Sequence, residues 1–101
     1  MKRFVLTPAA KADLDEIWEY IAKDNLASAV RVLDRIEFTI REITKRPAVG
    51  HVREELADSR HRFFPVGSYL IVYRFGTKPL QIVRILHASR DVHALLRFVS
   101  D

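Results

Sequence analysis

The sequence predicts an α+β domain of order β-α-α-β-β-β-α, in which a helical hairpin packs on one face of an antiparallel sheet. Two observations carry this prediction. Apolar residues recur at helical spacing from Ala10 to Ile43, and three strand-like segments follow between His61 and His87. The links between the two helices and between the three strands are short, which favours antiparallel neighbours. We expect residues 1–101 to form a single domain.

The first expected elements are an edge strand at KRFVL and a helix that follows it. Thr7 suits the N-cap position, and Pro8 suits the first helical position, where its missing N–H costs nothing. The apolar positions of this helix then follow at helical spacing: Ala10, Leu14, Ile17, Trp18 and Ile21. We expect the helix to end near residues 23–25.

The second expected helix begins after Asn25, which can cap it, and ends at Arg46-Pro47. Its apolar residues form one stripe: Ala29, Leu33, Ile36, Ile40 and Ile43. The very short link between the two helices predicts an antiparallel hairpin.

Three strands are expected next, at HRFFPV, YLIVYRF and LQIVRILH. Gly67-Ser68 and the GTKP segment form the turns between them, and Asp91 can cap a short C-terminal helix. The second and third strands are apolar at nearly every position, which predicts that both faces of the sheet are covered. The expected core residues are Ile17, Ile21, Leu33, Ile36, Ile40, Val72 and Ile85.

The composition narrows the classes of function. The chain has no cysteine, so neither a disulfide nor a thiolate metal site can hold the fold. Its four histidines follow no metal-ligand spacing, and we expect no metal and no cofactor. The segment MKRFVLTP lacks the apolar run of a signal peptide, and no segment is apolar enough to span a membrane. We therefore expect a cytoplasmic protein with a formal net charge of +4.

A polar cluster at the end of the last strand raises the possibility of RNA cleavage. His87 could act as a general acid or base, and Arg62, Arg84 and Arg90 could hold phosphate. Side chains alternate along a strand, however, which puts Arg84 on one face with Ile82 and His87 on the other, unless a bulge intervenes. A structural corner, with Asp91 as an N-cap, is the favoured interpretation.

One apolar residue lies on the charged side of the second helix. Phe38 is about 180° from the apolar stripe on a helical wheel, among arginines and acidic residues. We expect its side chain to be exposed and available for a partner contact.

Taken together, the motifs resemble the ParE branch of the ParE/RelE toxin superfamily. The resemblance covers nearly the whole chain and rests on four segments in this order: DLDEIWEYIA (13–22), the loop P-x-x-G-H-x-R-E-E-L (47–56), SYLIVYRF (68–75) and RILHASRD (84–91). It implies the toxin of a type II toxin–antitoxin pair, a class that includes plasmid-stabilisation systems. A cognate antitoxin neutralises such a toxin by wrapping it with its C-terminal segment.

The resemblance also implies alternatives for the target. ParE-like members are associated with inhibition of DNA gyrase by binding, whereas RelE-like members cut messenger RNA on the ribosome. This chain lacks the lysines of the RelE loop and a C-terminal tyrosine, so we expect a gyrase-binding toxin that is not an enzyme, with the ribosome-dependent RNase as the alternative. The expected target contacts are Arg90, Arg97 and Phe98, and the expected antitoxin contacts are Phe38 and Trp18. We expect no sequence-specific binding of nucleic acid.

Overall fold

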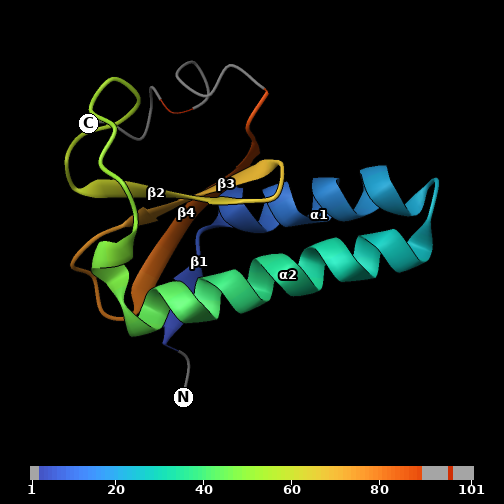
Figure 1. The fold of residues 1–101 in the computed structure, drawn as a ribbon, viewed down its shortest axis with the longest axis horizontal. Helices are drawn as coiled ribbons and strands as arrows, with labels where there is room; N and C mark the ends of the chain where they lie inside the picture. Colours follow the sequence, from blue (N-terminus) through green and yellow to red (C-terminus); the bar gives the residue numbers. More distant parts are fainter. Residues whose placement is uncertain (1–2, 90–95, 97–101) are drawn as a thin grey trace.

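The computed structural model describes residues 3–89 and residue 96 (Figure 1). The described elements follow the predicted order, and the α+β class is confirmed. They are β1 (Phe4–Leu6), α1 (Pro8–Ala22), α2 (Leu26–Lys45), the 3₁₀ turn η1 (Pro47–Val49), β2 (His61–Val66), β3 (Tyr69–Arg74) and β4 (Leu80–His87).

The four strands form one sheet in the order β1-β4-β3-β2. As predicted, β2, β3 and β4 are antiparallel neighbours, and Gly67 makes the first turn with a φ of 57°. The prediction of a wholly antiparallel sheet is wrong for β1, which pairs in parallel with β4. No hairpin connects β1 to its neighbour, so a short turn does not fix its direction. The sheet is therefore mixed.

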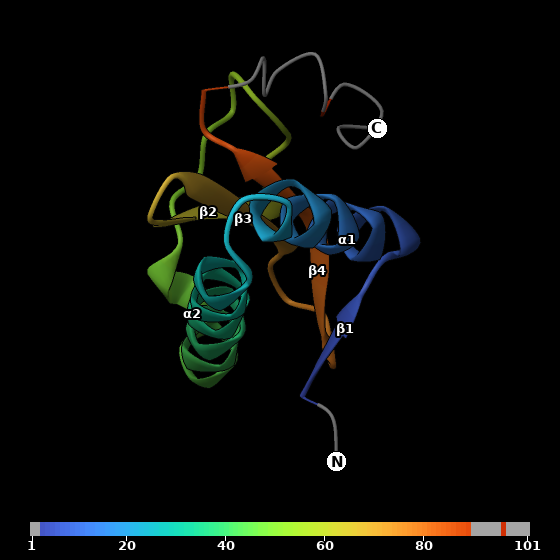
Figure 2. The ribbon, with the colours of Figure 1, turned by 90° about the vertical axis from the view of Figure 1, so that its right-hand side faces the viewer.

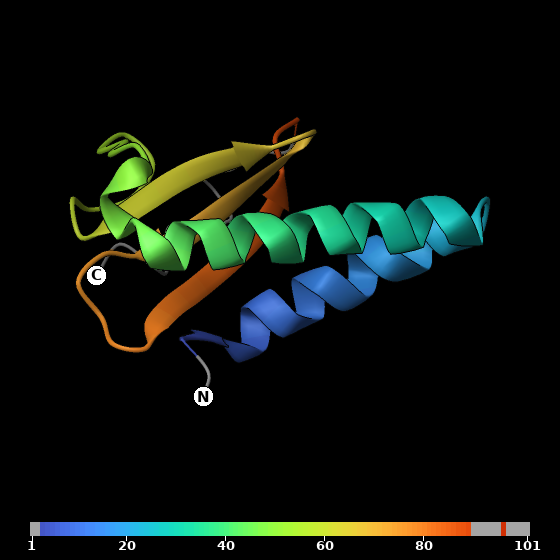
Figure 3. The same cartoon turned by 60° about the horizontal axis from the view of Figure 1, so that its bottom comes forward.

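Both helices cover the same face of the sheet, and the α1–α2 connection extends beyond the strands (Figures 2 and 3). The predicted caps of α1 and α2 are confirmed, whereas Asp91, the predicted cap of the C-terminal helix, lies outside the described residues. The Ala10 N–H donates to the Thr7 side chain at 3.1 Å, and the Ser28 N–H donates to the Asn25 side chain at 2.9 Å. These caps set where the two helices begin.

The main core lies between the helices and the sheet. Its fully or largely buried residues are Ala10, Ile17, Ile36, Ile40, Ile43, Val66, Ile71, Tyr73, Leu80, Ile82 and Ile85. Of the expected core residues, Ile21 and Leu33 are partly buried against this cluster, whereas Val72 belongs to a second cluster on the opposite face. The burial of the α2 stripe accounts for the attachment of the hairpin to the sheet.

The second face of the sheet is covered as well, which confirms the prediction drawn from the two-sided apolar strands. The covering cluster consists of Ala57, Phe63, Val72, Leu86 and Leu96, with Leu56, Leu70 and Val83 packed against it. The predicted C-terminal helix falls outside the described residues except for Leu96, which is helical and completely buried. The loop before β2 and Leu96 thus cover apolar surface that the helices leave open.

A bulge in β4 changes which of its residues share a face. Val72 pairs with Arg84, but Tyr73 pairs with Ile82, so Val83 is an extra residue in β4. Consequently Ile82 and Ile85 both enter the helix-side core. The prediction that Arg84 shares a face with Ile82 is wrong, because strict alternation fails at Val83.

A buried tyrosine ties the loop after α2 to the sheet. The Gly50 N–H donates to the Tyr73 hydroxyl at 2.8 Å, and that hydroxyl donates to the carbonyl of Pro47. A Cβ atom at position 50 would lie 2.3 Å from the hydroxyl oxygen, so the close approach requires glycine.

Removing this hydroxyl should destabilise the protein in a pH-dependent way. Tyr73→Phe leaves a buried N–H and a carbonyl without their partner, and we expect a loss of about 1–3 kcal/mol in the free energy of unfolding near pH 7. Burial raises the pKa of Tyr73, so the unfolded chain releases this proton first, at about pH 10. The difference in the free energy of unfolding between wild type and Tyr73→Phe should therefore shrink as pH rises above about 10. Denaturant unfolding of both proteins from pH 7 to 11 measures this, and an advantage that grows with pH would contradict it.

Candidate functional site

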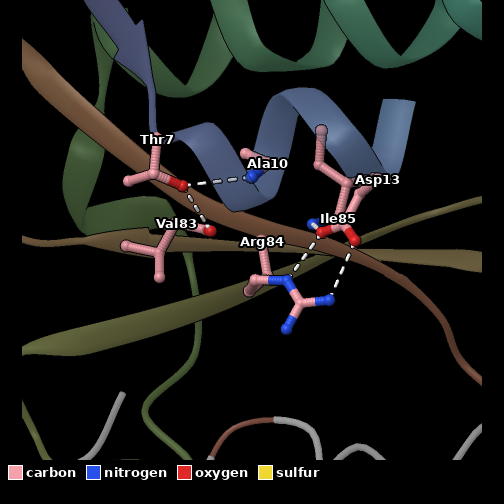
Figure 4. A network of polar contacts seen from close by, with 6 residues as sticks. All are labelled: Thr7, Ala10, Asp13, Val83, Arg84 and Ile85. Carbon is pink, nitrogen blue, oxygen red and sulfur yellow. Dashed lines mark hydrogen bonds and ion pairs between the residues drawn. The ribbon is translucent and has the colours of Figure 1, made fainter. Parts of the chain in front are cut away.

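A buried carboxylate closes part of the outer edge of β4 (Figure 4). β1 pairs with β4 only at residues 80–82, and no other strand in the described part of the chain lies along the rest of that edge. Asp13 of α1 accepts from the Ile85 N–H at 2.9 Å and from Arg84 Nε and Nη2 at 2.8 and 2.9 Å. Beside it, the Thr7 hydroxyl donates to the Val83 carbonyl at 2.8 Å. The first turns of α1 thus take over hydrogen bonds that a strand would otherwise make.

This arrangement determines what Arg84 can do. Its guanidinium is bound by both oxygens of Asp13, and the Asp13 carboxylate raises the pKa of Arg84. The Asp13 residue is only 6% exposed, so it needs a cationic partner. Arg84 was a candidate phosphate ligand, and the structure places it in an ion pair that supports the fold.

Arg62, the second candidate phosphate ligand, is also bound by its own chain. Its Nη1 donates to the carbonyls of Ala48 and Gly50 at 3.2 and 3.1 Å. Its guanidinium carbon lies 4.3 Å from the ring centroid of Phe75, a cation–π contact.

His87 lies at the opposite end of the sheet from Arg62. His87 pairs with Tyr69 and Arg62 pairs with Tyr73, which separates them by roughly 13 Å along β3 and places them on either side of it. His87 Nδ1 accepts from the Ser89 N–H at 3.2 Å. The three described members of the proposed RNase set therefore do not converge on one pocket, and the fourth, Arg90, lies outside the described residues.

A groove of about 1030 Å³ runs between the β1–α1 segment and α2. Its apolar lining comes from both sides: Phe4, Val5, Leu6, Leu14, Leu33, Ile36, Phe38 and Ile40. Charged residues of α2 border it, including Glu37, which pairs with Arg41 at 2.7 Å. Because β1 is an edge strand, this groove lies beside a sheet edge that can accept another strand.

The two expected antitoxin contacts differ in their relation to this groove. Phe38 lines it and is 65% exposed, which confirms the predicted exposure. Trp18 lies on α1, is 36% exposed, and is not among the lining residues. Their role in binding remains a prediction.

The expected target contacts Arg90, Arg97 and Phe98 all lie outside the described residues. Among residues 3–89 and 96, no group of three or more histidine and acidic side chains could hold a metal ion. In the same part of the chain, no helix is long and apolar enough to cross a membrane.

Asp13 is the important residue that the sequence prediction missed. It lies three residues after Ala10 and four before Ile17, so it occupies the buried stripe of α1. A carboxylate within an apolar stripe is a signal for a buried ionic partner.

A family model and the curated relatives of this chain point to the same family of proteins. Residues 4–92 match the family model described as "ParE toxin of type II toxin-antitoxin system, parDE". The chain is 34% identical over 97 residues to Toxin ParE1 of Caulobacter vibrioides, covering 95% of this chain and 99% of that protein. It is 30% identical over 92 residues to Toxin ParE1 of Mycobacterium tuberculosis, covering 89% and 93%.

A solved structure has the same fold. It is titled "Chromosomal ParDE TA system from P. aeruginosa", and the superposition has a TM-score of 0.70 over 85% of this chain and 95% of that one. The sequence identity is 21%, so this similarity concerns the fold.

Breaking the Asp13–Arg84 ion pair should lower the free energy of unfolding far more than breaking an ion pair on the surface. Arg84→Met leaves a buried carboxylate without its cation, and we expect a loss of about 3–5 kcal/mol in the free energy of unfolding. The control is Arg41→Met, which breaks the exposed pair with Glu37 and should cost about 0.2–1 kcal/mol. Chemical denaturation measures both, and equal losses would show that the Asp13 contact does not hold α1 on the sheet.

Proposed function

This chain belongs to the family of ParE toxins of type II toxin–antitoxin systems, and we propose that a cognate antitoxin neutralises it and that it inhibits DNA gyrase by binding. Both the antitoxin and gyrase would meet it in the cytoplasm. The observation that carries the antitoxin part of the proposal is the groove beside β1, with its exposed Phe38.

The groove has the properties of a peptide-binding site. It combines an apolar lining with charged residues at its border, which suits an amphipathic helix, and it lies beside an edge strand, which suits an added strand. Phe38 offers a large apolar side chain that is 65% exposed in the described part of the chain. Trp18, on the neighbouring helix, would extend the antitoxin contact.

The scattered candidate residues favour binding over RNA cleavage as the mode of action. Acid–base cleavage of RNA needs a proton-transfer group close to cations that hold the phosphate. Arg84 and Arg62 are both bound by other parts of the chain, and His87 lies away from Arg62. Ribosome-dependent RNA cleavage is the alternative that the experiment below tests.

We place the gyrase contact at the C-terminal segment, with Arg90, Arg97 and Phe98 as the contact residues. Leu96 is buried against the second sheet face, so deleting the C-terminal segment would also remove a core residue. Single substitutions at Arg97 and Phe98 are therefore better tests than truncation.

The groove proposal predicts unequal effects on antitoxin binding from two similarly exposed residues of α2. Phe38→Ala should weaken antitoxin binding by about 1–2 kcal/mol or more, because aromatic residues in a groove dominate interface energies. Leu26→Ala is the control, since Leu26 is 61% exposed on the same helix but does not line the groove. Titration calorimetry with the purified antitoxin measures both affinities. Equal losses of affinity in the two variants would show that the antitoxin binds outside the groove.

The gyrase proposal predicts that His87 is dispensable for toxicity beyond its effect on stability. His87→Ala should retain inhibition of gyrase supercoiling, whereas Phe98→Ala should reduce it strongly. An acid–base role would instead predict a loss of about 10²- to 10⁴-fold in cleavage of ribosome-bound mRNA by His87→Ala. Purified wild type and both variants are compared in the two assays, with melting curves to confirm folding. Cleavage of mRNA by wild type without any gyrase inhibition would reverse the proposal.

A further inference from the structure

A second cavity, of about 540 Å³, lies between α1 and the end of β4. It shares no lining residue with the groove. The lining residues that matter here are Glu16, Ile17, Tyr20, Tyr69, Ile85 and His87. They come from three elements, so the cavity is formed by the packing of α1 on the sheet.

Aromatic groups dominate one part of this cavity. The rings of Tyr69 and His87 meet edge to face, with centroids 5.2 Å apart. Tyr20 and Tyr69 both line the cavity, and burial together with the Tyr20 phenol raises the pKa of Tyr69. His87 Nδ1 accepts from the Ser89 N–H at 3.2 Å and lies 2.7 Å from the Ser89 hydroxyl oxygen.

The charge of this cavity is opposite to that of the whole chain. From Ala12 to Ala22, α1 carries four carboxylates and no lysine or arginine, although the chain has a net charge of +4. Asp13 is compensated by Arg84. None of the ion pairs among the described residues involves Glu16, although its carboxylate is near enough to Arg84 to help raise the pKa of that guanidinium. No described lysine or arginine lines the cavity itself. An acidic, aromatic cavity in a basic protein is complementary to a cation.

We infer that this cavity receives an arginine side chain from a partner protein. The planar guanidinium can stack on the tyrosine rings and donate two hydrogen bonds to the Glu16 carboxylate. Its aliphatic stem can pack on Ile17 and Ile85. A lysine ammonium would satisfy the charge but not the stacking. The inference is independent of the gyrase proposal, because it rests on the cavity and its charge alone.

The test uses N-acetylarginine amide as the probe and the full chain as the receptor. In ¹H–¹⁵N and aromatic NMR spectra, the probe should shift resonances of Tyr20, Tyr69 and His87. N-acetylcitrulline amide, which has the same shape without the charge, should not. Glu16→Gln should weaken probe binding by at least about tenfold, as expected for a lost hydrogen bond to a charged group. Asp15→Asn, one residue away on α1 but outside the cavity, should leave it unchanged.

Three results would overturn the inference. The first is an equal response to arginine and citrulline probes, and the second is an equal effect of Glu16→Gln and Asp15→Asn. The third is binding that appears only after Arg90→Gln or Arg97→Gln, which would make the chain's own arginine the occupant instead of a partner's.

Discussion

The structure depends on one buried carboxylate. Asp13 accepts hydrogen bonds from the Ile85 amide and the Arg84 guanidinium, and it is the contact through which α1 closes the edge of β4 beyond the short β1 strand. A buried charge is tolerated only when its partners are in place, so this contact fixes the height and rotation of α1 over the sheet. The groove on one side of α1 and the cavity on the other both follow from that position.

The same contact changes the functional interpretation of β4. On a strand, an arginine followed by a histidine suggests a phosphate ligand beside a proton-transfer group. Here the arginine neutralises Asp13, and the histidine packs against Tyr69 at the other end of the sheet from Arg62. Residues whose types suggest catalysis are instead used for packing and for closing a sheet edge. Among the apolar surfaces that the described residues leave exposed, the groove with Phe38 suits binding.

Local patterns predicted most of the fold. The caps at Thr7 and Asn25, the apolar stripe of α2 and the turn at Gly67 each depend on a few neighbouring residues, and each was predicted correctly. What could not be predicted was non-local. The parallel direction of β1 depends on which edge of β4 is free, and the bulge at Val83 depends on its pairing with β3. The buried position of Asp13 was missed, and its partner Arg84 lies 71 residues away in the sequence.

The two surfaces on α1 can act independently, and the helix geometry gives the reason. Lys11 and Leu14 line the groove, whereas Glu16, Ile17 and Tyr20 line the cavity, so the two sets occupy different sides of one helix at 100° per residue. Between them, Ala10 is buried in the close-packed core, and Asp13 holds the helix to β4. A partner bound on one side would therefore leave the other side's geometry in place. If the two proposals hold, an antitoxin in the groove would leave the acidic cavity available to a basic side chain of a partner.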